Sequence, residues 1–325
     1  FLVFSTFAHS EEANIEDIKK IANNFMIENN NKNFIIKEII KEDLVYIVNY
    51  NPTGFIIVSS NKHTIPILGY SFTKNINLLN MPIQLDGILK RYNQSIQYII
   101  ENNIETNEKI DQLWERYLSG NLYRNNQRIE IPPLITANWN QGGAWNNLCP
   151  GNSLVGCVAV AMGQVMYYWG HPEQGSGYSQ YYDPDYGVIS VVFSDHSYNF
   201  ENMNDINATY DSQLLLYHAG VAVHMNYTPW GSGASVCWDG PSAQSGLDEN
   251  FNYNDDITCE VKLNYSDEEW HELILDQLNR GWPMVYRGYS DDAGHAWNID
   301  GYQDQYFHCN WGWGGSANGY FYFDN

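Results

Sequence analysis

The chain has 325 residues, of which 44% are hydrophobic and 17% are charged, a composition typical of a globular protein and not of a disordered one. Its formal net charge of -22 argues against nucleic acid and against an anionic membrane surface as partners, because both are bound by clustered Lys and Arg. No uninterrupted apolar stretch of about 18 residues is present, so a membrane span is not expected.

Charge and tryptophan content divide the chain near residue 125. Residues 1–125 carry 12 Lys and Arg against 14 Asp and Glu, a net of -2, whereas residues 126–325 carry 4 against 24, a net of -20. Ten of the eleven tryptophans follow residue 125. Two compositions in one chain predict two domains, over 11–125 and 126–325.

The first ten residues, 1–10, form a largely apolar run that changes abruptly to polar at Glu11 and Glu12. This pattern is typical of the end of a signal peptide, so residues 1–10 are interpreted as a signal-peptide remnant. A buried first strand is the alternative. The signal-peptide interpretation predicts a secreted or extracytoplasmic protein.

The first domain has a helix pattern followed by strand patterns. Acidic residues open a segment in which Ile15, Ile18 and Ala22 fall on one stripe, which predicts an amphipathic helix. Alternating apolar residues around a turn at 51–54 predict strands. The expected elements are helices over 10–29 and 82–102 and strands over 34–40, 44–50 and 55–59. The polar, Asn-rich residues 103–128 are interpreted as a linker that a protease can reach.

The second domain is rich in Gly, Tyr and Trp, and its strongest helix pattern runs from Cys157 to Trp169. This segment is apolar on nearly all faces, so we expect it to be buried. The other expected elements are helices over 213–225 and 267–280 and strands over 283–289, 296–302, 306–310 and 320–323. A buried helix packed on an antiparallel sheet is an α+β organisation.

Three residues have the order and spacing of a papain-type cysteine protease. Cys157 lies in the first turn of the buried helix, where backbone N–H groups and the helix dipole favour a thiolate. Alone, such a cysteine is more often a small core residue. However, His295 follows 138 residues later, and Asn310 lies 15 residues after it. Papain-type enzymes place His and Asn roughly 130–150 residues after the nucleophilic Cys.

The chemistry of peptide hydrolysis explains why these residue types occur together. An imidazolium beside the thiolate stabilises the ion pair and later protonates the leaving amine. Asn310 would accept a hydrogen bond from the imidazole and hold the ring, while Trp311 or Trp313 would shield that bond. Gln141, 16 residues before Cys157, would form an oxyanion hole with the backbone N–H of Cys157.

The remaining cysteines and histidines predict no metal site and no cofactor. Cysteines 149, 237, 259 and 309 allow up to two disulfides in three pairings, but four free buried thiols are an equal alternative. No CxxC spacing is present, and the histidines are not clustered. We interpret His171, His218, His224 and His308 as structural, and Asp291 and Asp292 as turn residues.

Several segments carry a family resemblance in this order and spacing. They are Trp139–Gln141, Gly156–Ala159, Gln164–Met166, Gly294–Ala296, Ile299–Gly301 and Asn310–Gly315, with Gly54–Ser60 and Ile67–Tyr70 in the first half. Together they resemble the streptopain/interpain family of secreted bacterial cysteine proteases. The resemblance covers about residues 11–325.

This resemblance implies a papain-like catalytic domain over 126–325 and an inhibitory α+β prodomain over 11–125. It implies Cys157 as nucleophile, His295 as general acid and base, Asn310 and Trp311 as orienting groups, and Gln141 in the oxyanion hole. The expected protein is a secreted cysteine endopeptidase made as a zymogen, with polypeptide substrates and its own prodomain as inhibitor.

Two departures and two alternatives accompany this expectation. Family members continue past the position of Asn325, so a C-terminal truncation is expected, and the four additional cysteines are not in the family pattern.

One alternative is an inactive relative that acts as a protease inhibitor or adhesin. The abundance of Trp and Tyr suggests another, a carbohydrate-binding module with exposed aromatic residues on one sheet face.

Overall fold

The computed structural model describes residues 12–30, 33–121, 129–238, 240–289 and 294–323. The interpretations of residues 1–10 and of Asp291 and Asp292 lie outside these residues. The chain forms two compact units, each described here by itself. One consists of Phe1–Ile129 with Asp304–Tyr306 and Ser316–Asn325, and the other of Glu130–Gln303 with Phe307–Gly315.

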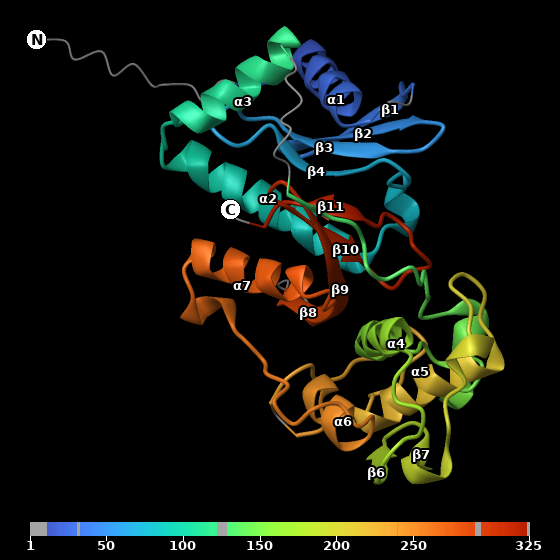
Figure 1. The fold of residues 1–325 in the computed structure, drawn as a ribbon. Coiled ribbons are helices and arrows are strands. Elements are labelled where there is room, and N and C mark those ends of the chain that lie inside the picture. Colours follow the sequence, from blue (N-terminus) through green and yellow to red (C-terminus); the bar gives the residue numbers. More distant parts are fainter. Residues whose placement is uncertain (1–11, 31–32, 122–128, 239, 290–293, 324–325) are drawn as a thin grey trace, which may run out of the picture. The chain divides into compact units, whose positions relative to one another are not determined.

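The first unit is an antiparallel sheet with helices on both faces (Figure 1). Its strands follow the order β1-β2-β3-β4-β11, so the chain's last described strand extends the N-terminal sheet. The elements are α1 (Ile15–Asn29), β1 (Ile35–Glu42), β2 (Val45–Asn51), β3 (Phe55–Ser59), β4 (Ile67–Ser71), α2 (Ile83–Glu101), α3 (Glu108–Ser119) and β11 (Gly319–Phe321). The predicted helices and strands of this half are confirmed, whereas β4 was not predicted.

Both faces of the central strands are buried because helices cover them. Tyr46 and Val48 of β2 point into a cluster with Ile18 and Phe25 of α1, to which α3 also contributes. On the opposite face Tyr92 of α2 lies against β4, in agreement with the placement of α2 in Figure 1. Burial on both faces explains why β2 and β3 are mostly apolar and do not alternate between apolar and polar residues.

The helix α3 corrects the prediction of a linker over 103–128. The Asn107 side chain accepts a hydrogen bond from the backbone N–H of Ile110 and caps the start of the helix, and Gly120, in a left-handed conformation (φ 71°), follows its last residue. Trp114 is buried, and its indole N–H donates to the Thr64 carbonyl at 2.7 Å. The prediction was wrong over 108–119 because few apolar residues anchor this otherwise polar helix.

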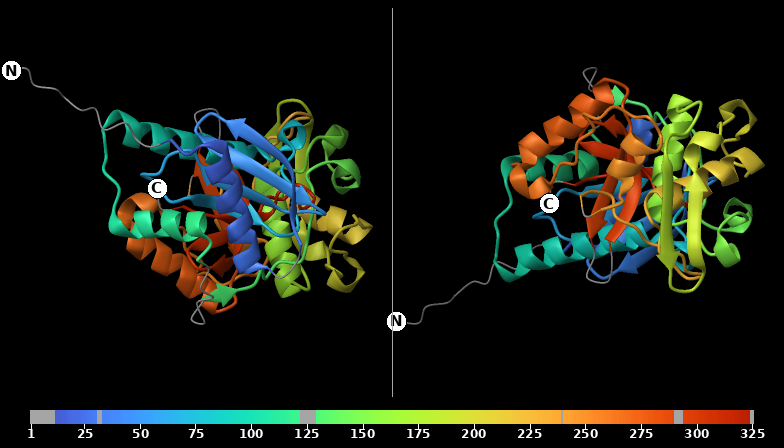
Figure 2. Two further views of the ribbon diagram at one scale, coloured as in Figure 1. Left: turned by 90° about the horizontal axis from the view of Figure 1, so that it is seen from above. Right: turned by 90° about the horizontal axis from the view of Figure 1, so that it is seen from below.

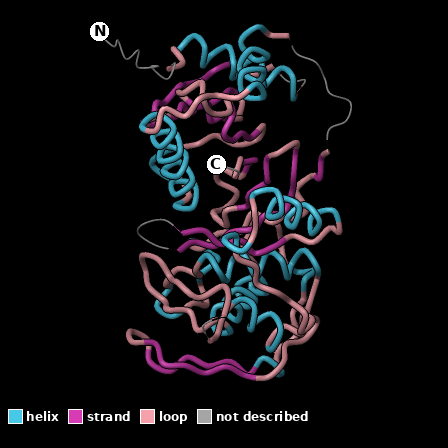
Figure 3. The backbone as a smooth tube through the Cα atoms, turned by 90° about the vertical axis from the view of Figure 1, so that its left-hand side faces the viewer, coloured by secondary structure: helices cyan, strands magenta, loops and turns pink. Residues whose placement is uncertain are grey.

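The second unit combines a helical core with a small antiparallel sheet. In this sheet β9 pairs with β8 and β5 and also neighbours β10, while β6 and β7 form a separate ribbon (Figures 2 and 3). The elements are β5 (Glu130–Ile131), α4 (Cys157–Trp169), β6 (Tyr178–Asp183), β7 (Gly187–Val192), α5 (Tyr210–Ala222), α6 (Ala243–Glu249), α7 (Asp267–Asn279), β8 (Met284–Tyr289), β9 (Gly294–Gln303) and β10 (Tyr306–Asn310). The α+β organisation is confirmed, but β5, β6, β7 and α6 were not predicted.

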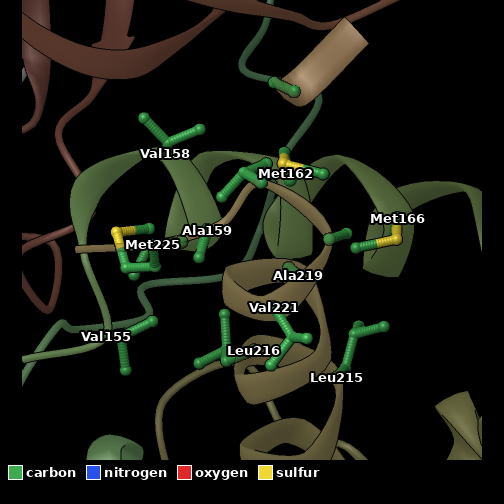
Figure 4. Packing of buried hydrophobic residues seen from close by; sticks show 14 of the residues in the cluster. Val155, Val158, Ala159, Met162, Met166, Leu215, Leu216, Ala219, Val221 and Met225 are labelled. Atoms are coloured by element: carbon green, nitrogen blue, oxygen red, sulfur yellow. The ribbon is translucent and has the colours of Figure 1, made fainter. Parts of the chain in front are cut away.

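The core of this unit lies where α4 crosses α5 (Figure 4). Met162 and Ala159 of α4 pack with Leu216 and Ala219 of α5 in one buried cluster. Gly163 allows the close approach, since a Cβ there would lie 2.7 Å from Cδ2 of Leu216. Residues 158–166 of α4 are all buried, as its apolar sequence predicts. The helix also packs on β9.

The cysteines form one disulfide among the described residues. Cys237 and Cys259 are bonded and close a loop that contains α6, whereas Cys149 and Cys309 are buried free thiols. One disulfide with two free thiols matches neither expected alternative, which were two disulfides or four free thiols. In the described part of the chain, no helix is long and apolar enough to cross a bilayer.

Candidate active site

Cys157 is the first residue of α4, as the sequence predicts. The preceding Gly156 has a φ of 91°. A Cβ on Gly156 would lie 2.6 Å from Sδ of Met225 and 3.2 Å from the Ser232 carbonyl oxygen. Only glycine satisfies both the backbone conformation and this close packing. The tight turn therefore fixes the start of α4 and the position of the thiol.

The Cys157 sulfur meets the backbone of β9 directly beside His295. The Ala296 N–H donates to Sγ of Cys157 at 3.5 Å. Burial by surrounding protein atoms raises the pKa of the Cys157 thiol, and the hydrogen bond from Ala296 opposes this effect. The two elements that carry the predicted nucleophile and its acid–base partner are thus in contact.

His295 is partly buried, and this burial lowers its pKa. Its Nε2 atom is buried without a hydrogen-bond partner among the described residues. Among the residues that the structure describes, no hydrogen bond joins His295 to Cys157 or to Asn310. The described state therefore favours a neutral thiol and a neutral imidazole over an ion pair.

Asn310 makes its hydrogen bonds to other partners in this state. Its Nδ2 donates to the Ala137 carbonyl at 2.8 Å, and its Oδ1 accepts from the Gly312 N–H at 3.3 Å. Trp311 is fully buried, with its ring centroid 5.5 Å from that of Trp297. Both residues lie in the unit that holds Cys157, but the orienting contact expected between Asn310 and His295 is not among the described contacts.

Gln141 is buried and is held beside the start of α4 through its backbone. Its carbonyl accepts a hydrogen bond from Val155 N–H at 2.9 Å, and its own N–H donates to the Asn140 side chain at 2.7 Å. Val155 lies two residues before Cys157. The predicted oxyanion donor and the nucleophile are therefore anchored to the same turn.

Gln164 is a buried polar residue whose role sequence reasoning missed. Its Oε1 accepts from the Trp139 N–H at 3.2 Å, while its Nε2 lies 2.9 Å from Oδ1 of Asn298 and 3.4 Å from Oδ1 of Asn310. Asn298 in turn donates to the Ala161 carbonyl at 3.1 Å. This amide network, Gln164 with Asn298 and Asn310, joins α4, β9, β10 and the segment leading to Gln141. The sequence signal for this role is the single Gln within an otherwise apolar helix.

The other histidines have structural partners. His308 Nδ1 lies 2.6 Å from Oδ1 of buried Asp300, whose Oδ2 accepts from the Ile135 N–H. The Tyr198 hydroxyl lies 2.9 Å from Nδ1 of His218, and burial with a smaller effect of a neighbouring histidine lowers the pKa of His218 to about 3. Among the described residues, no group of three His, Cys, Asp or Glu is placed to hold a metal ion.

Comparisons with known proteins match both halves of the chain. The model of the Peptidase C10 family matches residues 139–321, and that of the Spi protease inhibitor matches residues 11–96. The thiol protease/hemagglutinin PrtT of Porphyromonas gingivalis is 28% identical, covering 89% of this chain but only 35% of PrtT. Streptopain of Streptococcus pyogenes is 26% identical, covering 86% of this chain and 74% of streptopain.

Solved structures match as well. A fragment of prointerpain A from Prevotella intermedia has a TM-score of 0.75 and 27% identity, covering 90% of this chain and 92% of that one. Active interpain A from the same species has a TM-score of 0.54 and 32% identity, covering 60% and 87%. These similarities confirm the predicted fold and the inhibitor-type N-terminal domain.

The pKa of Cys157 gives a pH-dependent prediction for the full-length protein. Because thiolate is the reactive form and burial raises this pKa, alkylation by iodoacetamide should increase with pH to a midpoint above the ordinary thiol value of about 8.5. The rate is measured by mass spectrometry of the Cys157 peptide, with buried Cys149 as an internal control that stays unmodified. A midpoint below the ordinary thiol value would contradict the neutral-thiol interpretation.

The amide network predicts a large effect of Gln164→Leu. Leucine leaves the Trp139 N–H without its partner and removes a donor to Asn298, at about 1–3 kcal/mol for each buried unsatisfied group. We expect a melting temperature lower by roughly 5 °C or more in thermal unfolding of the full chain. Gln180→Leu, at an exposed position of β6, is the matched control and should change it little. Equal melting temperatures for the two variants would show that the network contributes little stability.

Proposed function

Because the chain belongs to the Peptidase C10 family and is a cysteine-type peptidase, we propose that it is a secreted endopeptidase made as an inactive proenzyme. Cys157 is the proposed nucleophile and His295 the proposed general acid and base. One observation carries this assignment: the Cys157 sulfur, at the start of a buried helix, accepts a hydrogen bond from the residue directly after His295.

The proposed reaction follows from the residues at this position. The His295 imidazole removes the Cys157 proton, and the thiolate attacks the carbonyl carbon of the scissile peptide bond. The backbone N–H of Cys157 and the Gln141 side chain stabilise the resulting oxyanion. The imidazolium then protonates the leaving amine, and an acyl-enzyme forms. A water molecule deprotonated by His295 attacks the acyl-enzyme, which releases the acid and regenerates the thiol.

Asn310 and Trp311 are proposed to orient and shield His295 in the active form. Asn310 ends the strand next to β9, and Trp311 packs against Trp297, two residues after His295. An Asn side chain in this place fixes the imidazole tautomer without adding charge. For Asn310 to take this role, one of its present hydrogen bonds must rearrange.

Latency is proposed to reside in the charge states of the two catalytic groups. Burial raises the pKa of Cys157 and lowers that of His295, so proton transfer between them is disfavoured. Activation then requires His295 to reach the sulfur and the ion pair to gain hydrogen bonds. The match of residues 11–96 to a protease inhibitor supports the N-terminal domain as the inhibitory element, and polypeptides as substrates.

Secretion is supported by two features of the chain. Residues 1–10 have the apolar pattern of a signal-peptide end. The disulfide between Cys237 and Cys259 is typical of proteins in oxidising compartments.

Replacement of the nucleophile tests the proposed function. We expect Cys157→Ala to lower peptidase activity to about one-thousandth or less, because the remaining groups give only weak catalysis. Activity is measured on a peptide substrate, together with labelling by an irreversible thiol-directed epoxide. Cys149→Ala removes another buried free thiol and should retain both activity and label. Substantial turnover by Cys157→Ala would refute the assignment.

The proposed cut between the domains lies between Ser119 and Arg128. Helix α3 ends at Ser119, and β5, starting at Glu130, already pairs with β9. Residues 122–128 lie outside the described part of the chain. N-terminal sequencing of the stable product of autoprocessing should therefore begin within this window. A stable product that starts after Gln141 would contradict the boundary, since the proposed oxyanion donor would be lost.

A further inference from the structure

The strand β11 is part of the matched peptidase sequence, but it folds with the N-terminal unit. Residues 319–321 lie within the match to the peptidase family, which covers 139–321. In the structure, however, these residues belong to the compact unit formed by the N-terminal residues. There β11 lies beside β4 (Figure 1) and pairs with it in antiparallel fashion. Tyr320 lies opposite Tyr70, and Phe321 lies opposite Gly69. A strand within the matched peptidase sequence thus extends the sheet of the inhibitor-type domain.

Two glycines let the strands approach closely. A Cβ on Gly319 would lie 2.5 Å from the Tyr70 carbonyl oxygen. A Cβ on Gly69 would lie 2.8 Å from Cδ1 of Phe321 and 3.1 Å from the Tyr320 carbonyl oxygen. Side chains at either position would displace backbone atoms of the opposite strand. Each strand therefore carries a glycine where its partner needs space.

Aromatic rings and hydrogen bonds extend the contact beyond the paired residues. Tyr70 stacks on Tyr320 with centroids 5.2 Å apart, and fully buried Phe321 lies against Phe55 at 6.0 Å. The Tyr92 hydroxyl lies 2.7 Å from the Leu68 carbonyl and 2.8 Å from the Tyr322 carbonyl. In addition, the Tyr322 N–H donates to the Leu68 carbonyl at 3.0 Å.

Tyr306 adds a second anchor from the peptidase sequence. Its hydroxyl donates to the Ile67 carbonyl at 3.0 Å, and its ring packs edge-on against Tyr70 at 5.2 Å. The N-terminal sheet is therefore bound by two separate segments, 304–306 and 316–323, that come long after the proposed cut. None of these contacts involves the linker.

We propose that the inhibitor-type domain is held by strand addition to β11, so that cutting the linker does not release it. The cut N-terminal domain stays bound as a separate chain until the β4–β11 pairing is broken. Release would expose Phe321 and the edge of β11, which makes this edge the recognition site for the free domain. The inference rests on the proposed cut before Glu130 but not on the catalytic roles.

The test uses the full chain with Cys157→Ala, which prevents self-digestion, and with residues 122–128 replaced by the recognition sequence of a site-specific protease. After cleavage, the two fragments should co-elute in size-exclusion chromatography at micromolar concentration. Gly319→Val should make them separate. Gly231→Val is the matched control, because no atom lies within 4 Å of its Cβ position, and its fragments should stay together.

Separation of the fragments without any glycine substitution would overturn the inference, and so would Gly319→Val fragments that remain together. If Gly319→Val does not fold before cleavage, Tyr92→Phe replaces it, since only the hydroxyl between the Leu68 and Tyr322 carbonyls is removed. We expect its fragments to dissociate with a constant roughly tenfold higher, and an unchanged constant would count against the pairing. No turnover is measured, so failure here is distinct from failure of the proposed catalysis.

Discussion

The buried amide of Gln164 is the interaction on which the arrangement of the site depends. One side chain inside an apolar helix binds the backbone of Trp139 and the side chains of Asn298 and Asn310. These partners belong to the segment before Gln141, to the strand of His295 and to the strand next to it. Because buried polar groups must be satisfied together, a shift in any one of these elements leaves an amide without a partner. The network therefore fixes their mutual position more strictly than apolar packing does.

The neutral state of the predicted catalytic pair follows from burial alone. Both Cys157 and His295 lie where protein atoms replace water, which disfavours charge on each of them. Backbone N–H groups at the start of α4 and that of Ala296, which contributes most, oppose this effect at the sulfur. An ion pair forms only if added hydrogen bonds and mutual attraction exceed the loss of solvation. Small movements of β9 relative to α4 therefore strongly influence whether the neutral pair or the ion pair is favoured.

The sequence predicted those features that depend on local pattern. The start of α4 at Cys157 could be read from the apolar run and the preceding Gly156, and most elements followed from periodicity. The helix α3 was missed because only a few residues, including Trp114 and Tyr117, anchor it in a polar sequence. The pairing of β11 with β4 joins residues some 250 positions apart, and no local pattern encodes such a contact. The partners of Asn310 were missed for the same reason.

The disulfide has a consequence for the redox conditions under which the protein works. The proposed nucleophile, Cys157, must stay reduced to act, whereas the loop that carries α6 is closed by an oxidised pair, Cys237 and Cys259. A small thiol that restores an oxidised nucleophile is also able to exchange with this bridge. Because α6 packs on α4, opening the loop would loosen the support of the helix that begins at Cys157. The proposed activity is therefore confined to a range of thiol–disulfide conditions, with oxidation of Cys157 at one limit and reduction of the Cys237–Cys259 bond at the other.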